Sequence, residues 1–357
     1  MIKKELIELN KKLVRFKTIS SNKSELERCI RFIENYFNIN NLFKKIFYSN
    51  GIPSLLVSNS LSKNPDLLLN GHIDVVEGNN NQFKPFVKND KLYGRGTIDM
   101  KSSIAVIMLI MKKLKSTNKK ISAMFVSDEE IFGKDGTKYI LNKGYKPKFT
   151  IITEESNFDI VIKQKGQLTL KLEAKGKSGH GSQPWTGLNA IEELIEIYQK
   201  IRNLFPKEQK NTWNINSINL GIINGGVAPN VIPSKAELIL DIRYPTNLKL
   251  DSFLVRFYGI LRKSSVTYSL LTKTNPMDSG NAIFFINKLK PIVEKQIKRK
   301  AKLKWTNYCS DGRYFSDSKL PVIEFGPTGA NYHTDNEYVD INSLVNYYEI
   351  LKRFIIS

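Results

Sequence analysis

Histidine is scarce in this chain, and each occurrence lies in a polar segment that contains glycine or asparagine. The three segments are Gly71-His72-Ile73-Asp74, Ser178-Gly179-His180-Gly181 and Asn331-Tyr332-His333-Thr334-Asp335. None of the three lies on the apolar face of a predicted helix, where a histidine is usually a packed core residue. Turn-like surroundings favour a chemical role instead, as a metal ligand or as a general acid or base.

Carboxylates follow the predicted strands or, in one case, come directly before a predicted helix. They are Asp74, Asp99, Glu129, Glu130 and Glu154. Ligands of an open α/β sheet bind at the carboxyl ends of its strands. We therefore expect these side chains to converge there with His72. The alternative interpretation is that they are ordinary surface charges at strand ends.

The spacing of these residues suggests which of them could bind metal and which could support or assist a metal ligand. Asp74 lies two positions after His72, so on an extended segment both side chains face the same way. Asp74 can then reach the second imidazole nitrogen and fix its tautomer. Glu129 and Glu130 are adjacent and point to opposite sides, so one can bind metal while the other faces a substrate. Spacing alone leaves open which residue does which.

Imidazole and carboxylate ligands without cysteine suit a catalytic zinc ion, and also manganese or cobalt. Two ions about 3.5–4 Å apart need a bridging carboxylate and share an activated water. A free carboxylate beside that water can take its proton and pass it to a leaving amine. The cluster thus implies metal-dependent hydrolysis of an amide bond.

Other catalytic signatures are missing from the sequence. It contains no Gly-x-Ser-x-Gly elbow, no phosphate-binding Gly-x-x-x-x-Gly-Lys-Ser/Thr loop and no His-Glu-x-x-His helix. Its two cysteines, Cys29 and Cys309, do not form a disulfide scaffold and fit a reducing compartment. A Cys-His nucleophile is disfavoured, because one cysteine near a polar turn does not establish it.

The elements that must position these residues form an α/β pattern at both ends of the chain. Strands are predicted at 67–69, 121–126 and 149–152, with a helix after Lys101. After Pro276 the pattern resumes with a helix over 282–299, a strand over 322–325 and a helix from Asn342. This alternation predicts a catalytic domain with a mixed sheet and helices on both faces.

The middle of the chain has a different period. Apolar and polar residues alternate strictly over 168–174 and 238–242, which predicts strands with one buried face. Helices are predicted over 189–202 and 248–261. A length of 357 residues suits two domains. We therefore predict a catalytic domain formed by 1–166 and 276–357, with a smaller α+β domain inserted over 167–275.

The net charge of +21 is unusually high. It admits a basic module that binds nucleic acid as an alternative, but the lysines are spread along the chain. The densest cluster lies at or after the end of a predicted helix, where a solvated basic face is expected: Lys295, Lys298, Arg299, Lys300, Lys302 and Lys304. The segment Met1–Leu6 reads as an amphipathic helix, and the run Ile104–Met111 is too short to span a bilayer. We expect a soluble cytoplasmic protein without a membrane partner.

Several longer segments resemble the di-zinc deacylases and exopeptidases, a family that includes succinyl-diaminopimelate desuccinylase, acetylornithine deacetylase, aminoacylase and carboxypeptidase G. The similar segments run in the family's order over nearly the whole chain. They are 71–76, 92–101, 127–130, Gly179-His180, Gly225-Gly226, 230–233, 241–243, 310–313 and His333 before Glu337.

The resemblance implies a role for each matching position. His72 and Glu154 would hold one zinc, Glu130 and His333 the other, and Asp99 would bridge them. Asp74 would orient His72, and Glu129 would act as general base and acid. The Asp99–Met100 peptide would be cis. His180 would steady the oxyanion, often from the partner subunit, while Asn230, Arg243 and Ser310 would bind the substrate. The inserted domain would form a lid and a homodimer interface.

The implied reaction is removal of an acyl group from a small N-acyl amino acid by a metal-bound hydroxide, as in desuccinylases or deacetylases. A dipeptidase or carboxypeptidase of the same family is the main alternative, and an inactive basic nucleic-acid-binding module is a remote one. Three departures from the family bear on these expectations. Glu155 follows Glu154 where Pro is usual, Tyr308-Cys309 replaces Gly-Thr, and the segment 181–185 differs from that of desuccinylases.

Overall fold

The computed structural model describes residues 2–38, 42–114, 117–206, 213–248, 250–262 and 264–357. They divide into two compact units. The larger unit contains 1–162, 278–304 and 310–357, and the smaller unit contains 163–277 and 305–309. The division expected from the sequence, with boundaries after residues 166 and 275, stays a prediction. Met1 of the predicted N-terminal helix lies outside the described residues.

The larger unit is built on a mixed sheet, as the sequence predicts. Part of its strand order is β1-β2-β6-β3-β7-β15-β8. β3 lies parallel to both β6 and β7, and β15 lies parallel to β7, whereas β1 and β2 are antiparallel to their neighbours. The bounds are β1 (Phe43–Ser49), β2 (Ile52–Ser58), β3 (Leu67–His72), β6 (Ile121–Val126), β7 (Thr150–Ile152), β8 (Ile160–Gln164) and β15 (Val322–Glu324).

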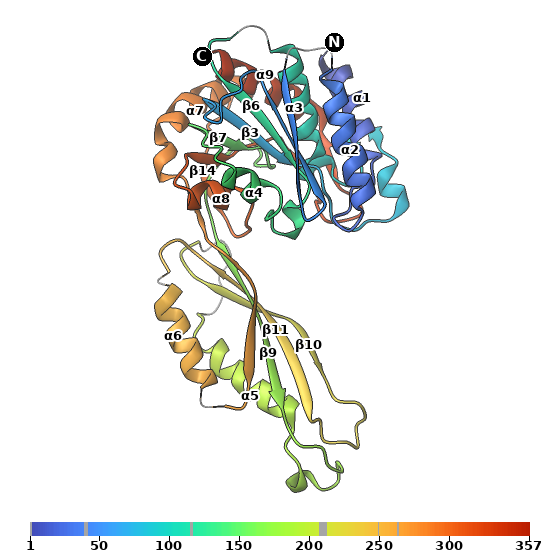
Figure 1. Ribbon diagram of the computed structural model, residues 1–357, viewed down its shortest axis with the longest axis vertical. Coiled ribbons are helices and arrows are strands. Elements are labelled where there is room, and N and C mark those ends of the chain that lie inside the picture. The colour runs from blue at the N-terminus through green and yellow to red at the C-terminus, as the bar shows by residue number, and fades with distance from the viewer. Residues whose placement is uncertain (1, 39–41, 115–116, 207–212, 249, 263) are drawn as a thin grey trace. The chain divides into compact units, whose positions relative to one another are not determined.

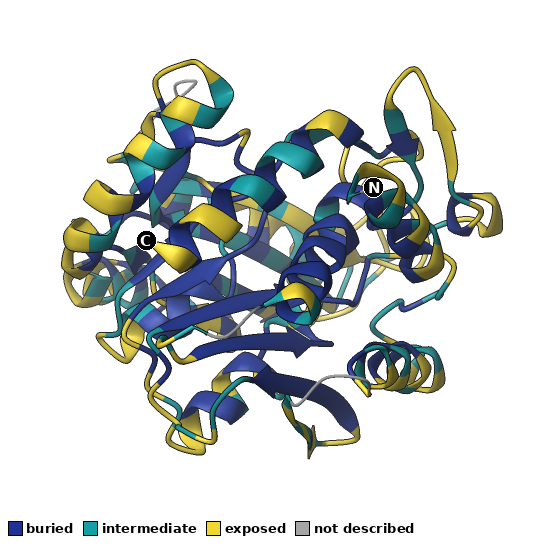
Figure 2. Ribbon diagram, turned by 90° about the horizontal axis from the view of Figure 1, so that it is seen from above, coloured by how far each residue is buried: buried dark blue, intermediate teal, exposed yellow. Residues whose placement is uncertain are grey.

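Helices cover both faces of this sheet, and its central strands are therefore buried along their whole length. Leu67 and Leu69 belong to a core formed with helices α1 (Ile2–Val14), α2 (Lys23–Tyr36), α3 (Ser102–Lys113), α7 (Ile283–Ile297) and α9 (Ile341–Ile356). Asn70 faces the other side, where its amide donates to Thr137 of α4 (Thr137–Asn142) at 3.1 Å. The dark-blue strands in Figure 2 show this two-sided burial.

Most predicted elements of the larger unit are present, with shifted ends. The strand at 121–126 has the predicted bounds, and the strand that begins at Leu67 continues to His72. The sequence analysis missed α2 and the β1–β2 hairpin. The sequence did contain a signal for the hairpin, the pair Asn50-Gly51 between the two strands. Both residues adopt positive φ, at 49° and 75°. Asn-Gly is the preferred pair for such a two-residue turn.

A second, small sheet of the larger unit joins two distant parts of the chain. Its strand order is β16-β17-β5-β4, and Tyr338 pairs with Tyr93 in the β17–β5 ladder. The bounds are β4 (Phe86–Lys88), β5 (Lys91–Tyr93), β16 (Gly329–Ala330) and β17 (Tyr338–Asp340). This sheet places the segment after β5 beside the segment that leads into β17.

The smaller unit is an antiparallel sheet covered on one face by two helices (Figure 1). The order β10-β11-β9-β12 contains the predicted alternating strands as β9 (Gly166–Lys175) and β11 (Lys235–Tyr244), flanked by β10 (Ser217–Gly225) and β12 (Thr267–Thr274). Leu170 and Leu240 pack against Leu194 of α5 (Ala190–Arg202) and Phe257 of α6 (Leu250–Leu261). Residue 249 of the helix predicted over 248–261 lies outside the described residues.

The basic cluster begins with Lys295 in the last turn of α7, which ends at Ile297, and continues beyond the helix. Asp159 receives two of its cations: Arg299 Nη1 lies 2.8 Å and Lys304 Nζ 2.7 Å from its carboxylate. The backbone N–H of Lys302 donates to the same group at 3.1 Å.

Within the described residues, no helix is long and apolar enough to cross a membrane.

Asp159→Asn should lower the free energy of unfolding at pH 7 by about 1–2 kcal/mol, since it removes charge-assisted hydrogen bonds from a buried carboxylate. Burial alone would raise the pKa of Asp159, but Arg299 and Lys304 outweigh it and hold the pKa below its usual value. The carboxylate's contribution is therefore present above the unfolded pKa of about 4 and is lost as the pH falls below it. Urea unfolding of both proteins at pH 7 and pH 3 measures this difference, and a pH-independent difference would contradict the assignment.

Candidate metal centre

The strand order explains why the predicted ligands meet. β6, β3 and β7 are neighbours and run parallel, so their carboxyl ends lie at one edge of the sheet. His72 ends β3, Glu129-Glu130 follow β6, and Glu154 follows β7. Asp99 comes from the segment that precedes α3, and His333 from the segment between β16 and β17.

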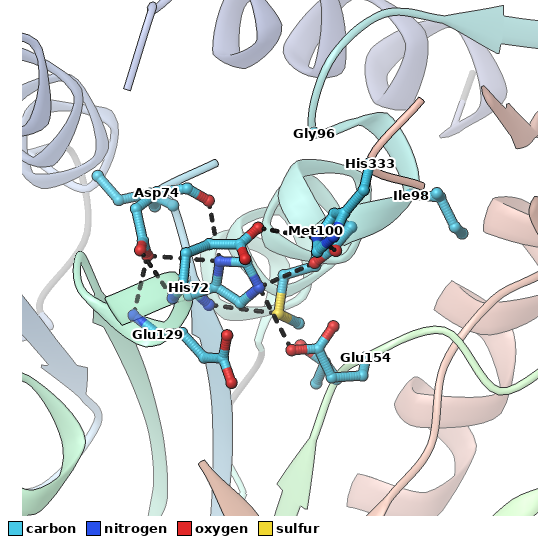
Figure 3. Close-up of polar contacts among 12 residues, drawn as sticks. His72, Asp74, Gly96, Ile98, Met100, Glu129, Glu154 and His333 are labelled. Atoms are coloured by element: carbon cyan, nitrogen blue, oxygen red, sulfur yellow. Dashed lines mark hydrogen bonds and ion pairs between the residues drawn. The ribbon is translucent and has the colours of Figure 1, made fainter. Parts of the chain in front are cut away.

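Two groups of side chains in the larger unit could each hold a metal ion, and they share Asp99. In the first group, His72 Nε2 lies 3.0 Å from Asp99 Oδ1 and 3.3 Å from Glu154 Oε1. In the second, His333 Nε2 lies 3.0 Å from Asp99 Oδ2 and 3.3 Å from Glu130 Oε1. Each oxygen of Asp99 thus faces a different histidine. Figure 3 shows His72, Glu154 and His333 converging on this centre.

The donor atoms fit a pair of zinc ions. Zinc lies about 2.0–2.1 Å from its nitrogen and oxygen ligands, so two ligands of a tetrahedral site are separated by roughly 3.3 Å. The four nitrogen-to-oxygen distances, 3.0 and 3.3 Å in each group, lie close to that value. Three protein ligands in each group leave room for a shared water, as in catalytic sites.

Asp74 holds more of the site than the sequence indicates. His72 Nδ1 is 2.9 Å from the main-chain carbonyl of Asp74 and 3.4 Å from its carboxylate. The carboxylate also accepts the backbone N–H groups of Glu129 and Glu130, at 3.2 and 3.0 Å. One buried side chain thus connects the histidine of the first group to the turn that carries both glutamates.

The electrostatics of the centre indicate an excess of buried negative charge. Hydrogen bonds that His333 donates to the carboxylates of Asp99 and Glu130 raise its pKa to about 10. Burial works against a charged His72, but Glu154, Asp74 and Asp99 outweigh it and raise its pKa well above the usual value. Burial raises the pKa of Glu154 to about 7. Protons and divalent cations therefore compete for this centre, and metal binding should release protons.

Glu129 lies beside the two groups but, within the described residues, belongs to neither. Its pKa is raised well above the usual value by burial, with the nearby carboxylates of Asp311 and Glu154 adding to the effect. Its backbone N–H is fixed by Asp74 at 3.2 Å. The arrangement provides a carboxylate that can exchange protons close to the ligands, which is what a general base and acid requires.

His180 and Asn230 lie on paired segments of the smaller unit. Gly181 N–H donates to the carbonyl of Asn230 at 2.8 Å, and His180 pairs with Val231 in an isolated bridge. Both His180 and Asn230 are exposed to solvent. His180 Nδ1 accepts the N–H of Ser182 at 3.2 Å, which favours a proton on Nε2. These contacts bring His180, predicted to steady the oxyanion, beside Asn230, predicted to bind the substrate, while both roles stay predictions.

Arg243 and Ser310 have partners that sequence reasoning did not anticipate. Arg243 Nε donates to Asp241 at 3.0 Å, and its Nη1 lies 3.8 Å from Cys309 Sγ. Ser310 is buried, and its hydroxyl accepts the N–H of Gly312 at 3.3 Å at the start of α8 (Gly312–Asp317). These contacts give Ser310 a part in ordering the turn before α8, and its predicted contact with substrate stays a prediction.

Sequence reasoning missed two residues near the turn of Glu129 and Glu130. Asp311, fully within the interior, receives a hydrogen bond from Thr137 Oγ1 at 2.5 Å. Arg313 donates from Nη2 to the carbonyl of Phe132 at 2.9 Å. Both residues belong to the segment 310–313 that resembles the family. Their partners are far away in the sequence, so no local signal could predict these hydrogen bonds.

Comparison with known proteins identifies the family. The profile described as Peptidase family M20/M25/M40 matches residues 68–357. The chain belongs to this family. A succinyl-diaminopimelate desuccinylase of Rickettsia bellii strain RML369-C is 31% identical over 321 residues, which cover 82% of this chain and 81% of the relative. One of Rickettsia felis is 28% identical over 324 residues, covering 83% and 84%. As an M20 member, the chain is a metal-dependent hydrolase that acts on amide or peptide bonds.

Solved structures show the same fold across the M20 family. A tripeptidase from Staphylococcus aureus matches with a TM-score of 0.83 at 18% identity, covering 99% of this chain and 97% of that one. A metallo-carboxypeptidase from Sulfolobus solfataricus matches with a TM-score of 0.81 at 16% identity, covering 98% of each chain. The Asp99–Met100 peptide is cis in this chain, as the family resemblance implied.

Glu154 and Glu155 provide a matched pair for testing the ligand set, since only Glu154 belongs to the group of His72 and Asp99. Glu154→Gln should lower the metal content from about two ions per chain to about one after dialysis, because one site loses a charged ligand. Glu155→Gln should keep both ions. Metal analysis of the folded variants measures this, and the reverse pattern would assign the ligand to Glu155.

Proposed function

We propose that this M20 hydrolase holds two zinc ions and removes the acyl group from an N-acyl amino acid. The observation that carries the proposal is the position of Asp99, whose two oxygens each lie 3.0 Å from a different histidine. A carboxylate shared in this way is the feature that a two-metal hydrolytic site needs. Cobalt or manganese would suit the same ligands.

In this proposal, His72 and Glu154 hold one ion, His333 and Glu130 hold the other, and Asp99 bridges them. Bound zinc would polarise the substrate carbonyl and lower the pKa of a water molecule. Asp74 keeps His72 and the turn of Glu129 and Glu130 in place through the contacts described above. The protein's part in this centre is therefore to fix ligands before any substrate arrives.

Glu129 is proposed to move the proton during the reaction. It takes a proton from the attacking water as a bond forms between the water oxygen and the carbonyl carbon. It then gives that proton to the amide nitrogen as the carbon–nitrogen bond breaks. The products are a carboxylic acid and an amine, and Glu129 returns to its starting state.

The substrate contacts are proposed for residues of the smaller unit and for Ser310. His180 would donate a hydrogen bond to the developing oxyanion. Arg243 would grip the substrate carboxylate with its guanidinium group, and Asn230 would add a polar contact. The smaller unit is also proposed to form a homodimer interface. A cytoplasmic location stays a prediction.

The substrate class is proposed from the curated relatives, which are named succinyl-diaminopimelate desuccinylase. Tyr308-Cys309 stands where the desuccinylases have Gly-Thr, so acetyl and succinyl groups are both retained as candidates. A dipeptidase or carboxypeptidase would use the same metal centre and remains the second candidate. The complete ligand set and the family membership favour either of these over an inactive nucleic-acid-binding module.

A substrate panel tests the proposal. Protein stripped by a chelator should be inactive and should regain amide hydrolysis when zinc, cobalt or manganese is added. The panel contains succinyl-diaminopimelate, acetylornithine and several dipeptides. We expect turnover to be fastest on an acylated amino acid, whereas fastest turnover on a dipeptide would support the second candidate. No metal-dependent hydrolysis of any compound would refute the proposed function.

Glu129→Ala should lower kcat by about 10²–10⁴-fold, the usual contribution of general acid–base catalysis. The metal content should stay near that of the wild type, because Glu129 belongs to neither group of ligands. Steady-state kinetics and metal analysis of the same preparation measure both effects. Glu130→Ala is the control and should lose metal, whereas metal loss in Glu129→Ala would mean that base and ligand have been exchanged.

A further inference from the structure

We infer that Glu337 is a positioning residue of the metal centre, which holds the main chain of Asp99 against the segment that carries His333. The inference rests on the proposed function, in which Asp99 bridges two ions and His333 binds one of them. Glu337 lies four positions after His333 and, among the described residues, belongs to neither group of candidate ligands. It would act through the backbone.

The carboxylate of Glu337 receives hydrogen bonds from the segment that leads into Asp99. Its Oε2 accepts the N–H of Gly96 at 2.8 Å. Its Oε1 accepts the N–H of Ile98 at 3.0 Å and, more weakly, that of Asp99 at 3.3 Å. The side chain of Glu337 is 1% exposed, so bulk water does not compete with these donors for its carboxylate.

Arg95 completes the environment of this buried charge. Its Nη1 lies 3.0 Å from Glu337 Oε2, and its Nη2 donates to the carbonyl of Glu77 at 3.2 Å. Arg95 is itself 3% exposed. A buried carboxylate is tolerated when it is paired and hydrogen-bonded. Here the guanidinium and the converging N–H groups meet both conditions.

The backbone of Glu337 is fastened to the same segment. Its carbonyl accepts the N–H of Gly94 at 3.1 Å, and the next residue, Tyr338, pairs with Tyr93. Gln82 adds a further tie, because its side chain donates to the carbonyl of Thr334 at 3.0 Å. The segment that carries His333 and the segment that carries Asp99 are therefore held as one piece.

This arrangement matters because Asp99 belongs to both groups of ligands. Gly96 and Ile98 come shortly before Asp99 in the chain. Because the N–H groups of both donate to Glu337, this side chain fixes the course of the main chain there. A shift of the backbone at Asp99 would move both carboxylate oxygens and disturb two metal sites together. Loss of the Glu337 contacts should therefore weaken metal binding and lower kcat, with a smaller effect on KM.

Glu337→Gln tests the inference, with Asp159→Asn as the matched control. Asp159 is also a buried carboxylate that accepts a backbone N–H and pairs with cations, but its partners lie beyond α7. Metal-free proteins are titrated with zinc in competition with a chelator, at a temperature where circular dichroism shows both to be folded. We expect Glu337→Gln to weaken zinc affinity about 10–100-fold, the usual effect of losing a residue that supports a ligand. Asp159→Asn should lower stability and leave the affinity unchanged.

The absorption spectrum of the cobalt-loaded proteins gives a second readout, because it reports the ligand geometry. It should change in Glu337→Gln and not in Asp159→Asn. Wild-type affinity and spectrum in Glu337→Gln, or equal loss in both variants, would overturn the inference. Glu337→Asp keeps the charge but shortens the reach to the N–H groups, so it should also bind zinc more weakly. If Glu337→Gln does not fold, wild-type zinc affinity in Glu337→Asp overturns the inference. If the wild-type protein itself binds no metal, the proposed function fails instead.

Discussion

The shared carboxylate of Asp99 is the constraint on which the rest of the centre depends. Its two oxygens lie 3.0 Å from His72 and from His333, which come from the first and the last segment of the larger unit. To serve both, the side chain must be held in one orientation, and the surrounding elements must bring two sets of ligands to it. The parallel strands β3, β6 and β7 bring His72, Glu130 and Glu154 to it, and the segment before β17 brings His333. The fold of the larger unit thus holds the candidate ligands in fixed positions around Asp99.

This arrangement also concentrates negative charge in the interior of the larger unit. Several carboxylates lie within or next to the centre, and burial raises the pKa of Glu154 and Glu129. Such a cluster is unfavourable unless cations or protons compensate it. The same carboxylates raise the pKa of His72 and His333 above its usual value. In the proposed function, two divalent ions would compensate this buried negative charge.

Supporting carboxylates form a distinct layer around the ligands. Asp74 binds the backbone of Glu129 and Glu130, while Glu337 binds that of Gly96 and Ile98. Both use an acidic side chain to organise N–H groups, and neither has its oxygens in the two ligand groups. The sequence predicted the contact of Asp74 with His72 from their spacing of two. It could not predict the contacts of Glu337, because Gly96 and Ile98 lie far from it in the chain and the pairing of β17 with β5 brings them together.

The sequence by itself determined the chemistry available to this protein and much of its local structure. Histidines in polar turns and acids at strand ends indicated the metal ligands, and the strict alternation over 168–174 and 238–242 indicated β9 and β11. The family resemblance assigned the pairing of ligands, which spacing left open. The tertiary structure groups Glu154, which the resemblance had already preferred to Glu155, with His72 and Asp99. Only the tertiary structure decided that Glu337 holds the segment before Asp99. The reason is physical: side-chain type and periodicity are local properties, whereas a hydrogen bond or a shared ion depends on which distant segments the fold places a few ångströms apart.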